Sequence, residues 1–494
     1  MVTISPALRT RVAPQRMALD VGFMRRTFLV IGLLLLLISP FAPDPVPFAV
    51  GGFVPWVLLS IIGLPHMPVA AIFYFVWQWS QVFARALLSI VDGESMGSSV
   101  AGAGVLNAYW YSLASLVVLA CAFRLVFGGM RGPSSEEAGA HLEWRPRDLF
   151  MLYCGTLVLA IACTYAIRLV PGLSQQIEAV SRLKVVAEFL LFVTVMGTGR
   201  GNTFLLAAVV VEIVIGFSGL LSDFRGVFVY LAMAAIAARI VLSVTSIVAG
   251  VAWFSVLLGL GLFWTAVKTE YREYATGGEE TQHFSIPLED RLAYLGNLAL
   301  SSGSIDWGLA SYAMLYRFAY IDIFGSVIAY QDAAREAAPM RQWQGALEHV
   351  FKPRIFFPEK AALSDTETYA RLAGLDPALV LRDSTSISVG YMAENYVDMG
   401  FPGMLAGIFV LGLMLAGAIR YFMGARHLPW MVKQGIALAL VYNVAGVGLE
   451  ASMPKLFGSI IMFFLVYLVL AKFVLPIGLQ WLQARAGAES APKS

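Results

Sequence analysis

Long apolar stretches follow one another along most of the chain, and one polar segment interrupts them. Twelve stretches are apolar enough to be candidate membrane spans, for which about 20 residues are typical. They lie at 25–43, 47–64, 67–90, 105–128, 148–170, 184–198, 203–221, 226–244, 247–267, 400–422, 434–450 and 457–480. Because the membrane core offers no partner to exposed backbone groups, these stretches are predicted to be α-helices.

The pattern predicts an all-α polytopic membrane protein with three parts. Residues 1–267 form a bundle of about nine helices, 268–399 form one large loop domain outside the membrane, and 400–494 hold about three more helices and a tail. Within the loop, Leu, Tyr, Phe and Ile recur at helical spacing over 287–300 and 305–330, with charges between them. This predicts amphipathic helices that lie along the membrane surface.

Basic residues in the short loops predict the orientation. Lys and Arg are enriched in cytoplasmic loops. The Arg-rich N-terminus, the segment 131–147, the loop 420–433 and the C-terminal tail share one side if both termini are cytoplasmic. The loop at 268–399 then lies on the opposite face.

Composition limits the function classes. The chain has 59% hydrophobic and 13% charged residues, whereas soluble proteins have about a quarter charged. A net charge of +2 gives no support to nucleic-acid binding. The five histidines lack metal-ligand spacing and no Gly-rich phosphate loop is present, so no metal and no cofactor is expected.

The densest polar cluster lies at 352–360 and reads Lys-Pro-Arg-Ile-Phe-Phe-Pro-Glu-Lys. Two prolines fix the backbone and basic side chains surround an aromatic pair, an arrangement suited to phosphate oxygens near a lipid surface. Arg354 and Lys360 are the candidates here, with Arg382 further along. A surface turn with solvated charges is the alternative.

A second cluster lies at 383–403, just before the tenth span. If a helix begins at about Ile387, then Tyr391, Glu394 and Asp398 share one face. A carboxylate at the membrane edge can have a raised pKa and act as a base toward a sugar hydroxyl. Capping and interfacial anchoring by the Ser, Tyr and Asn residues of this segment explain it equally well.

A third cluster lies at 218–226, on the same outer face by the predicted topology. Arg225 opposes the positive-inside trend there, which favours an anionic ligand such as a diphosphate. A structural pair with Asp223 is an equally simple explanation. Among the ionisable residues within spans, Glu212 lies deep enough to need a partner.

In its order of parts, the chain resembles the Wzy-type polymerases of bacterial O-antigen and exopolysaccharide synthesis, in the wider group that includes the O-antigen ligases. The resemblance rests on the Ser-Asp-Phe-Arg-Gly turn at 222–226, the large late loop, and the segment 394–403 that ends in Gly-x-x-Gly. Ligases carry a His-Asn pair about ten residues before that Gly-x-x-Gly. The stretch 383–399 has no histidine, so the polymerase is preferred.

The resemblance implies a multi-pass protein of the bacterial inner membrane that joins oligosaccharide repeat units at the periplasmic face. A sugar hydroxyl attacks the anomeric carbon of a glycan on polyprenyl diphosphate, which leaves. Fixed positive charge stabilises the departing diphosphate. Glu394 is implied as the base with Asp398 behind it, and the diphosphate is assigned to Arg225, Arg354, Lys360 and Arg382.

The implied partners are the lipid-linked oligosaccharide, membrane lipid, a chain-length regulator and a flippase. Three alternatives stay open. A ligase-like glycan transferase would use the same face, and a lipid or polysaccharide transporter would need mid-membrane charges such as Glu212. A non-catalytic assembly subunit would tolerate the loss of all these charges.

Overall fold

The computed structural model describes residues 18–99, 101–218, 224–277, 286–301, 303, 305–334, 340–352, 357, 359–360, 364–376, 387–446 and 448–487. Over these ranges the regular structure is helical, apart from one isolated bridge between Ala18 and Val241. This confirms the predicted all-α class. The helices that cover the predicted spans are α1 (Val21–Ile38), α2 (Pro45–Ile62), α3 (Val69–Asp92), α4 (Ala103–Phe127), α6 (Pro146–Leu169), α8 (Leu183–Thr198), α9 (Asn202–Ser218), α10 (Arg225–Ala237), α11 (Val244–Thr276), α18 (Tyr391–Met423), α19 (Trp430–Ala445) and α20 (Met453–Val469).

Seven helical segments in the described part of the chain are long and apolar enough to cross a membrane. They are α1 with the turn after it, α2, α4, α6, α11, α18, and α20 with its extension through α21 (Leu475–Gly487) to Arg485. The chain is therefore a helical membrane protein. Helices α3, α8, α9, α10 and α19 are shorter or less apolar, so the count of twelve spans and the side of the loop stay predictions.

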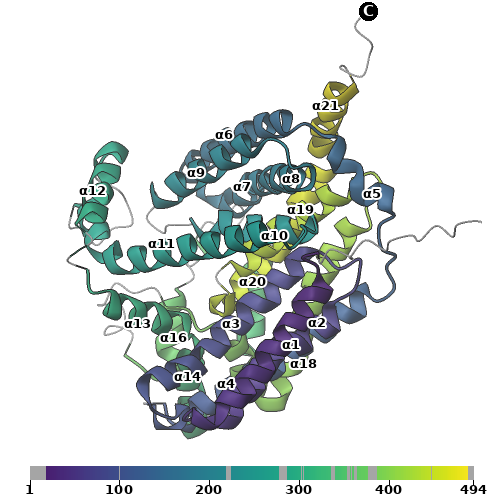
Figure 1. Cartoon of the computed structure of the whole chain (residues 1–494). Helices are drawn as coiled ribbons and strands as arrows, with labels where there is room; N and C mark the ends of the chain where they lie inside the picture. The colour runs from purple at the N-terminus through teal and green to yellow at the C-terminus, as the bar shows by residue number, and fades with distance from the viewer. Residues whose placement is uncertain are drawn as a thin grey trace, which may run out of the picture.

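The helices of the long loop are α12 (Leu288–Leu300), α13 (Trp307–Phe318), α14 (Ile321–Ala334), α15 (Arg341–Phe351) and α16 (Asp365–Leu372). In Figure 1, α12 and α13 lie at the C-terminal end of the long α11, against which both pack. Shorter helices α5 (Ser135–Gly139) and α7 (Ser174–Ser181) precede α6 and α8.

The amphipathic helix predicted over 305–330 is two helices, with a break after Phe318. The second of them, α14, packs against the start of α4, and its placement along the membrane surface stays a prediction. Ile321 and Val327 are buried, and a Cβ on Gly104 would come within 2.4 Å of the Gly325 carbonyl oxygen. Two facing glycines thus let the helices approach closely, and α14 belongs to the bundle.

The start of α18 is hydrogen-bonded to the segment that precedes α20. The backbone N–H of Tyr391 donates to the carbonyl of Ala451, 2.7 Å away, just before α20. Leu19, just before α1, donates its backbone N–H to the carbonyl of Ile240 at 2.8 Å. The start of α1 is thereby tied to the segment that precedes α11.

Candidate functional site

Helix α18 has two parts. It begins at Tyr391 rather than near Ile387, and non-helical backbone at Gly400 and Phe401 divides it. Gly400 has a φ of +60°, a conformation that favours glycine. The short first part precedes this kink in the chain and carries Glu394 and Asp398.

Glu394 holds the N-terminus of α20. Its side chain is 2% exposed, and its Oε2 accepts the backbone N–H of Met453, the first residue of that helix. The N-terminal N–H groups of a helix lack partners within the helix and carry partial positive charge, so a carboxylate there is stabilising. The residue predicted as the catalytic base is therefore a buried helix cap.

Asp398, one turn later, caps α15 in the same way. Its Oδ1 accepts the backbone N–H of Gln342 at 2.9 Å and its Oδ2 accepts that of Trp343 at 2.8 Å. The residue just before α15, Met340, has a φ of +64° and makes no side-chain cap. The cap of α15 thus comes from α18, some 55 residues away in the chain.

Lys360 binds the opposite end of α15. Its Nζ donates to the carbonyl oxygens of His349 and Lys352, the latter at 2.9 Å. Carbonyls at a helix C-terminus carry partial negative charge, which favours a cation. Helix α15 is therefore held by a carboxylate at its start and by an ammonium at its end.

Arg225 is the first residue of α10, and its side chain contacts the C-terminal end of α19. Its Nη2 donates to the carbonyl of Gly446 at 2.9 Å, and its guanidinium lies 5.7 Å from the centre of the Trp77 ring. Burial raises the pKa of Glu450, which the charges of Arg317 and Arg225 act to lower. Arg225 thus joins α10 to α3 and α19 beside a carboxylate.

Two of the predicted diphosphate ligands, Arg354 and Arg382, lie outside the described residues, as does Asp223.

Glu212 has the partners that its depth requires. Its carboxylate accepts from Lys184 Nζ at 2.6 Å and from the Tyr153 hydroxyl at 2.7 Å.

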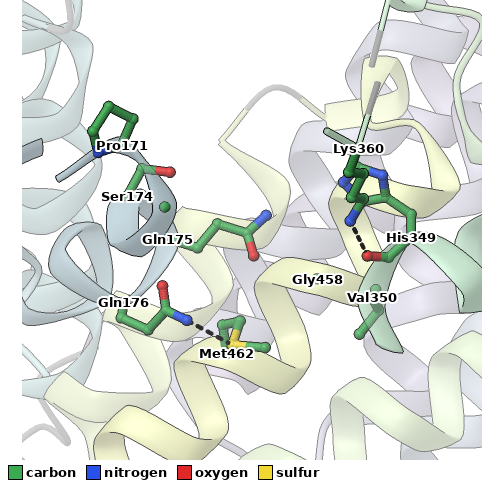
Figure 2. A pocket seen from close by; sticks show the side chains of 10 residues that line it. Pro171, Ser174, Gln175, Gln176, His349, Val350, Lys360, Gly458 and Met462 are labelled. Atoms are coloured by element: carbon green, nitrogen blue, oxygen red, sulfur yellow. Dashed lines mark hydrogen bonds between the residues drawn. The ribbon is translucent and has the colours of Figure 1, made fainter. Parts of the chain in front are cut away.

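A cavity of about 190 Å³ opens between α7, α15 and α20. Figure 2 shows Gln175 and Gln176 on one side of it and His349 with Lys360 on the other. The lining residues are Pro171, Gly172, Ser174, Gln175, Gln176, His349, Val350, Lys360, Gly458 and Met462. Side-chain amides and a hydroxyl both donate and accept hydrogen bonds, as sugar hydroxyls require, and an ammonium suits a phosphate.

The predicted residues contribute to this cavity unequally. Lys360 lines it, whereas Glu394 and Asp398 fix the N-termini of α20 and α15, which form two of its walls. Gln175 and His349 were not singled out from the sequence. The spacing of the histidines bears only on metal binding, but His349 stands three residues before the basic cluster at 352–360, and that proximity is the signal in the sequence.

No family model matches the chain. Neither a curated protein nor a solved structure matches it. The likeness to the polymerases therefore rests on the order of parts and the short motifs, and the geometry of the cavity carries the functional argument.

Proposed function

We propose that this chain is a membrane glycosyltransferase that polymerises oligosaccharide repeat units carried on polyprenyl diphosphate. The observation that supports the proposal most is the cavity between α7, α15 and α20, which is lined by several polar side chains. Two glutamines and a serine offer hydrogen bonds to sugar hydroxyls, and an imidazole and an ammonium face them (Figure 2).

The reaction needs a base and a positive charge. The acceptor hydroxyl attacks the anomeric carbon, the bond from that carbon to the diphosphate oxygen breaks with its electron pair, and the hydroxyl proton passes to the base. We assign the base to His349, because imidazole is the commonest general base and this one lines the cavity. Glu394 is instead 2% exposed, and its carboxylate accepts the backbone N–H of Met453.

Lys360 is the residue that we assign to the leaving diphosphate. Its ammonium faces the cavity while it contacts the end of α15, so charge that develops on the leaving group would meet a fixed cation. Arg225 contacts α3 and α19 and does not line the cavity. Its role in the proposal is to hold those helices together.

A transporter is the second candidate, and the Lys184–Glu212 pair favours it. The pair links α8 to α9, and Tyr153 joins it from α6. Ionisable residues inside the bundle often mark transport paths. In that case the pair would be essential for lipid movement, and the cavity residues would be dispensable.

Polymer length in cells separates these functions. At matched protein level, His349→Ala should reduce polymerisation by roughly 10²–10⁴-fold, the usual contribution of a general base. The control is His427→Ala, since His427 contacts the carbonyl of Ala471 and does not line the cavity. Normal polymer from His349→Ala would overturn the assignment of the base, and normal polymer from a Gln175→Ala, Lys360→Gln variant would overturn the cavity as the site.

A further inference from the structure

Helix α18 folds back on itself at the kink of Gly400 and Phe401. Asn395 precedes the kink and Gly407 follows it, and a straight α-helix would place these two residues about 18 Å apart. A Cβ on Gly407 would instead overlap the Oδ1 atom of Asn395. The first part of α18 therefore lies against the start of the second part, with the amide of Asn395 between them.

Asn395 is fully buried, and its amide contacts α15 and the start of α20. Its Oδ1 accepts the indole N–H of Trp343 in α15 at 3.0 Å. Its Nδ2 donates to the carbonyl of Tyr391 at 2.7 Å and lies 3.3 Å from the sulfur of Met453, the first residue of α20. Because the indole can only donate and the carbonyl can only accept, these partners fix the orientation of the amide.

Trp343 lies on the side of α15 that packs against α20. Its ring meets the ring of Phe457 edge-on, with the centroids 5.1 Å apart. Val350 stands about two turns after Trp343 on the same side of α15, and it lines the cavity. Gly458 follows Phe457 on α20 and lines the cavity too. The contacts of Trp343 therefore set how two walls of the cavity meet.

The position of His349 depends on the position of α15. His349 stands six residues after Trp343 in this helix and faces α7 across the cavity (Figure 2). Asp398 and Lys360 bind backbone groups at the two ends of α15, whereas Asn395 binds a side chain on the side that meets α20. Asn395 is therefore placed to set which side of α15 is turned toward α20.

We propose that Asn395 is a positioning residue: through Trp343 it sets how α15 lies on α20 and thereby where His349 stands in the cavity. The inference rests on the proposed function, because it takes His349 as the base of glycan polymerisation. Neither Asn395 nor Trp343 lines the cavity, so both act through α15. A shift of about 1 Å at a reacting group can cost about 10²-fold in rate, which is the size of the expected effect.

The kinetic test uses the full-length protein in liposomes with a lipid-linked repeat unit and measures kcat for glycan lengthening. Asn395→Leu keeps a side chain of similar size and removes both hydrogen bonds. It should lower kcat about 100-fold in wild type but less than about threefold in His349→Ala, because residues that act as a unit have non-additive effects. An equal loss of kcat in the two backgrounds would overturn the positioning role.

Two further variants control for folding. Trp343→Phe removes the indole N–H and keeps an aromatic ring, so it should show the same non-additive loss if Asn395→Leu does not fold. Gln434→Leu is the matched control, since Gln434 is 2% exposed and its Oε1 accepts the backbone N–H of Val69 in α3 at 2.9 Å. It should retain the wild-type kcat. A loss in Gln434→Leu equal to that in Asn395→Leu would show a general effect of buried amides and overturn the inference.

A distance measurement separates the failure of this inference from that of the proposed function, because it needs no activity. With the native cysteines replaced, spin labels at Gln344→Cys in α15 and Leu465→Cys in α20, both exposed, report the separation of the two helices. Asn395→Leu should shift or broaden the distance distribution, as should Gly407→Ala, whose methyl group would take the place of Oδ1. Gln434→Leu should leave the distribution unchanged. An unchanged distribution in Asn395→Leu would overturn the inference, whereas a shifted one in a protein that never lengthens the glycan would overturn the proposed function instead.

Discussion

Removing the Asp398 carboxylate should release the N-terminus of α15. In Asp398→Ala, the backbone N–H groups of Gln342 and Trp343 lose acceptors at 2.9 Å and 2.8 Å in a buried setting. Loss of a helix cap costs about 0.5–2 kcal/mol, and leaving buried donors without partners costs about 1–3 kcal/mol each. Because water that enters the site can replace part of the lost hydrogen-bond energy, we expect local destabilisation of about 2–4 kcal/mol.

Hydrogen–deuterium exchange measures this effect directly. The amides of α15 should exchange roughly 30-fold to 1,000-fold faster in Asp398→Ala, since about 1.4 kcal/mol corresponds to tenfold. Asp398→Asn keeps one acceptor oxygen and should show a smaller change. The control is Glu348→Gln, on the exposed side of the same helix, where loss of the surface ion pair with Lys352 should change exchange by less than about threefold. Unchanged exchange in Asp398→Ala together with lost polymer would refute the capping role and restore the catalytic one.

The remaining predictions concern the buried pair, the second cap and the topology. Lys184→Met should destabilise the protein by about 3–5 kcal/mol, because it leaves Glu212 buried without its cation. Adding Glu212→Gln should recover most of this stability, measured by thermal unfolding. Equal stability of the single and double variants would contradict the prediction. Glu394→Gln keeps an oxygen for Met453 and should retain the wild-type melting temperature and polymer, whereas Glu394→Leu should lose about 1–3 kcal/mol. A Glu394→Gln protein that folds but makes no polymer would return the base to Glu394. With the native cysteines replaced, Gly278→Cys should be labelled by an impermeant thiol reagent in intact cells and Ser135→Cys should not; the reverse pattern would invert the topology.

The helices were predictable because apolar length is a property of each segment alone. The span predicted at 105–128 is a helix at Ala103–Phe127, and that predicted at 148–170 is a helix at Pro146–Leu169. The role of α14 was not predictable in this way. The amphipathic pattern of residues 305–330 does not identify the helix that it packs against, and the close approach of Gly104 to Gly325 shows that this helix is α4.

The candidate site shows the same limit. The spacing of Glu394 and Asp398 on one helix face follows from the sequence, and the structure confirms that the two residues lie on one helix. Their partners are backbone N–H groups of Met453 and of Gln342 with Trp343, more than 50 residues away in the chain. The sequence shows the two carboxylates but not the helix N-termini that they contact. It therefore does not distinguish a helix cap from a catalytic base. His349 enters the cavity through the packing of α15 on α20.

Reconstitution of the purified protein in liposomes with a lipid-linked repeat unit tests the central claim most directly. Glycan length and the movement of the lipid between leaflets are followed in the same sample. If the cavity between α7, α15 and α20 is the active site of a glycosyltransferase, wild type should lengthen the glycan and His349→Ala should lengthen it far more slowly. Neither protein should move the lipid. Movement of the lipid by wild type with no lengthening of the glycan would contradict it.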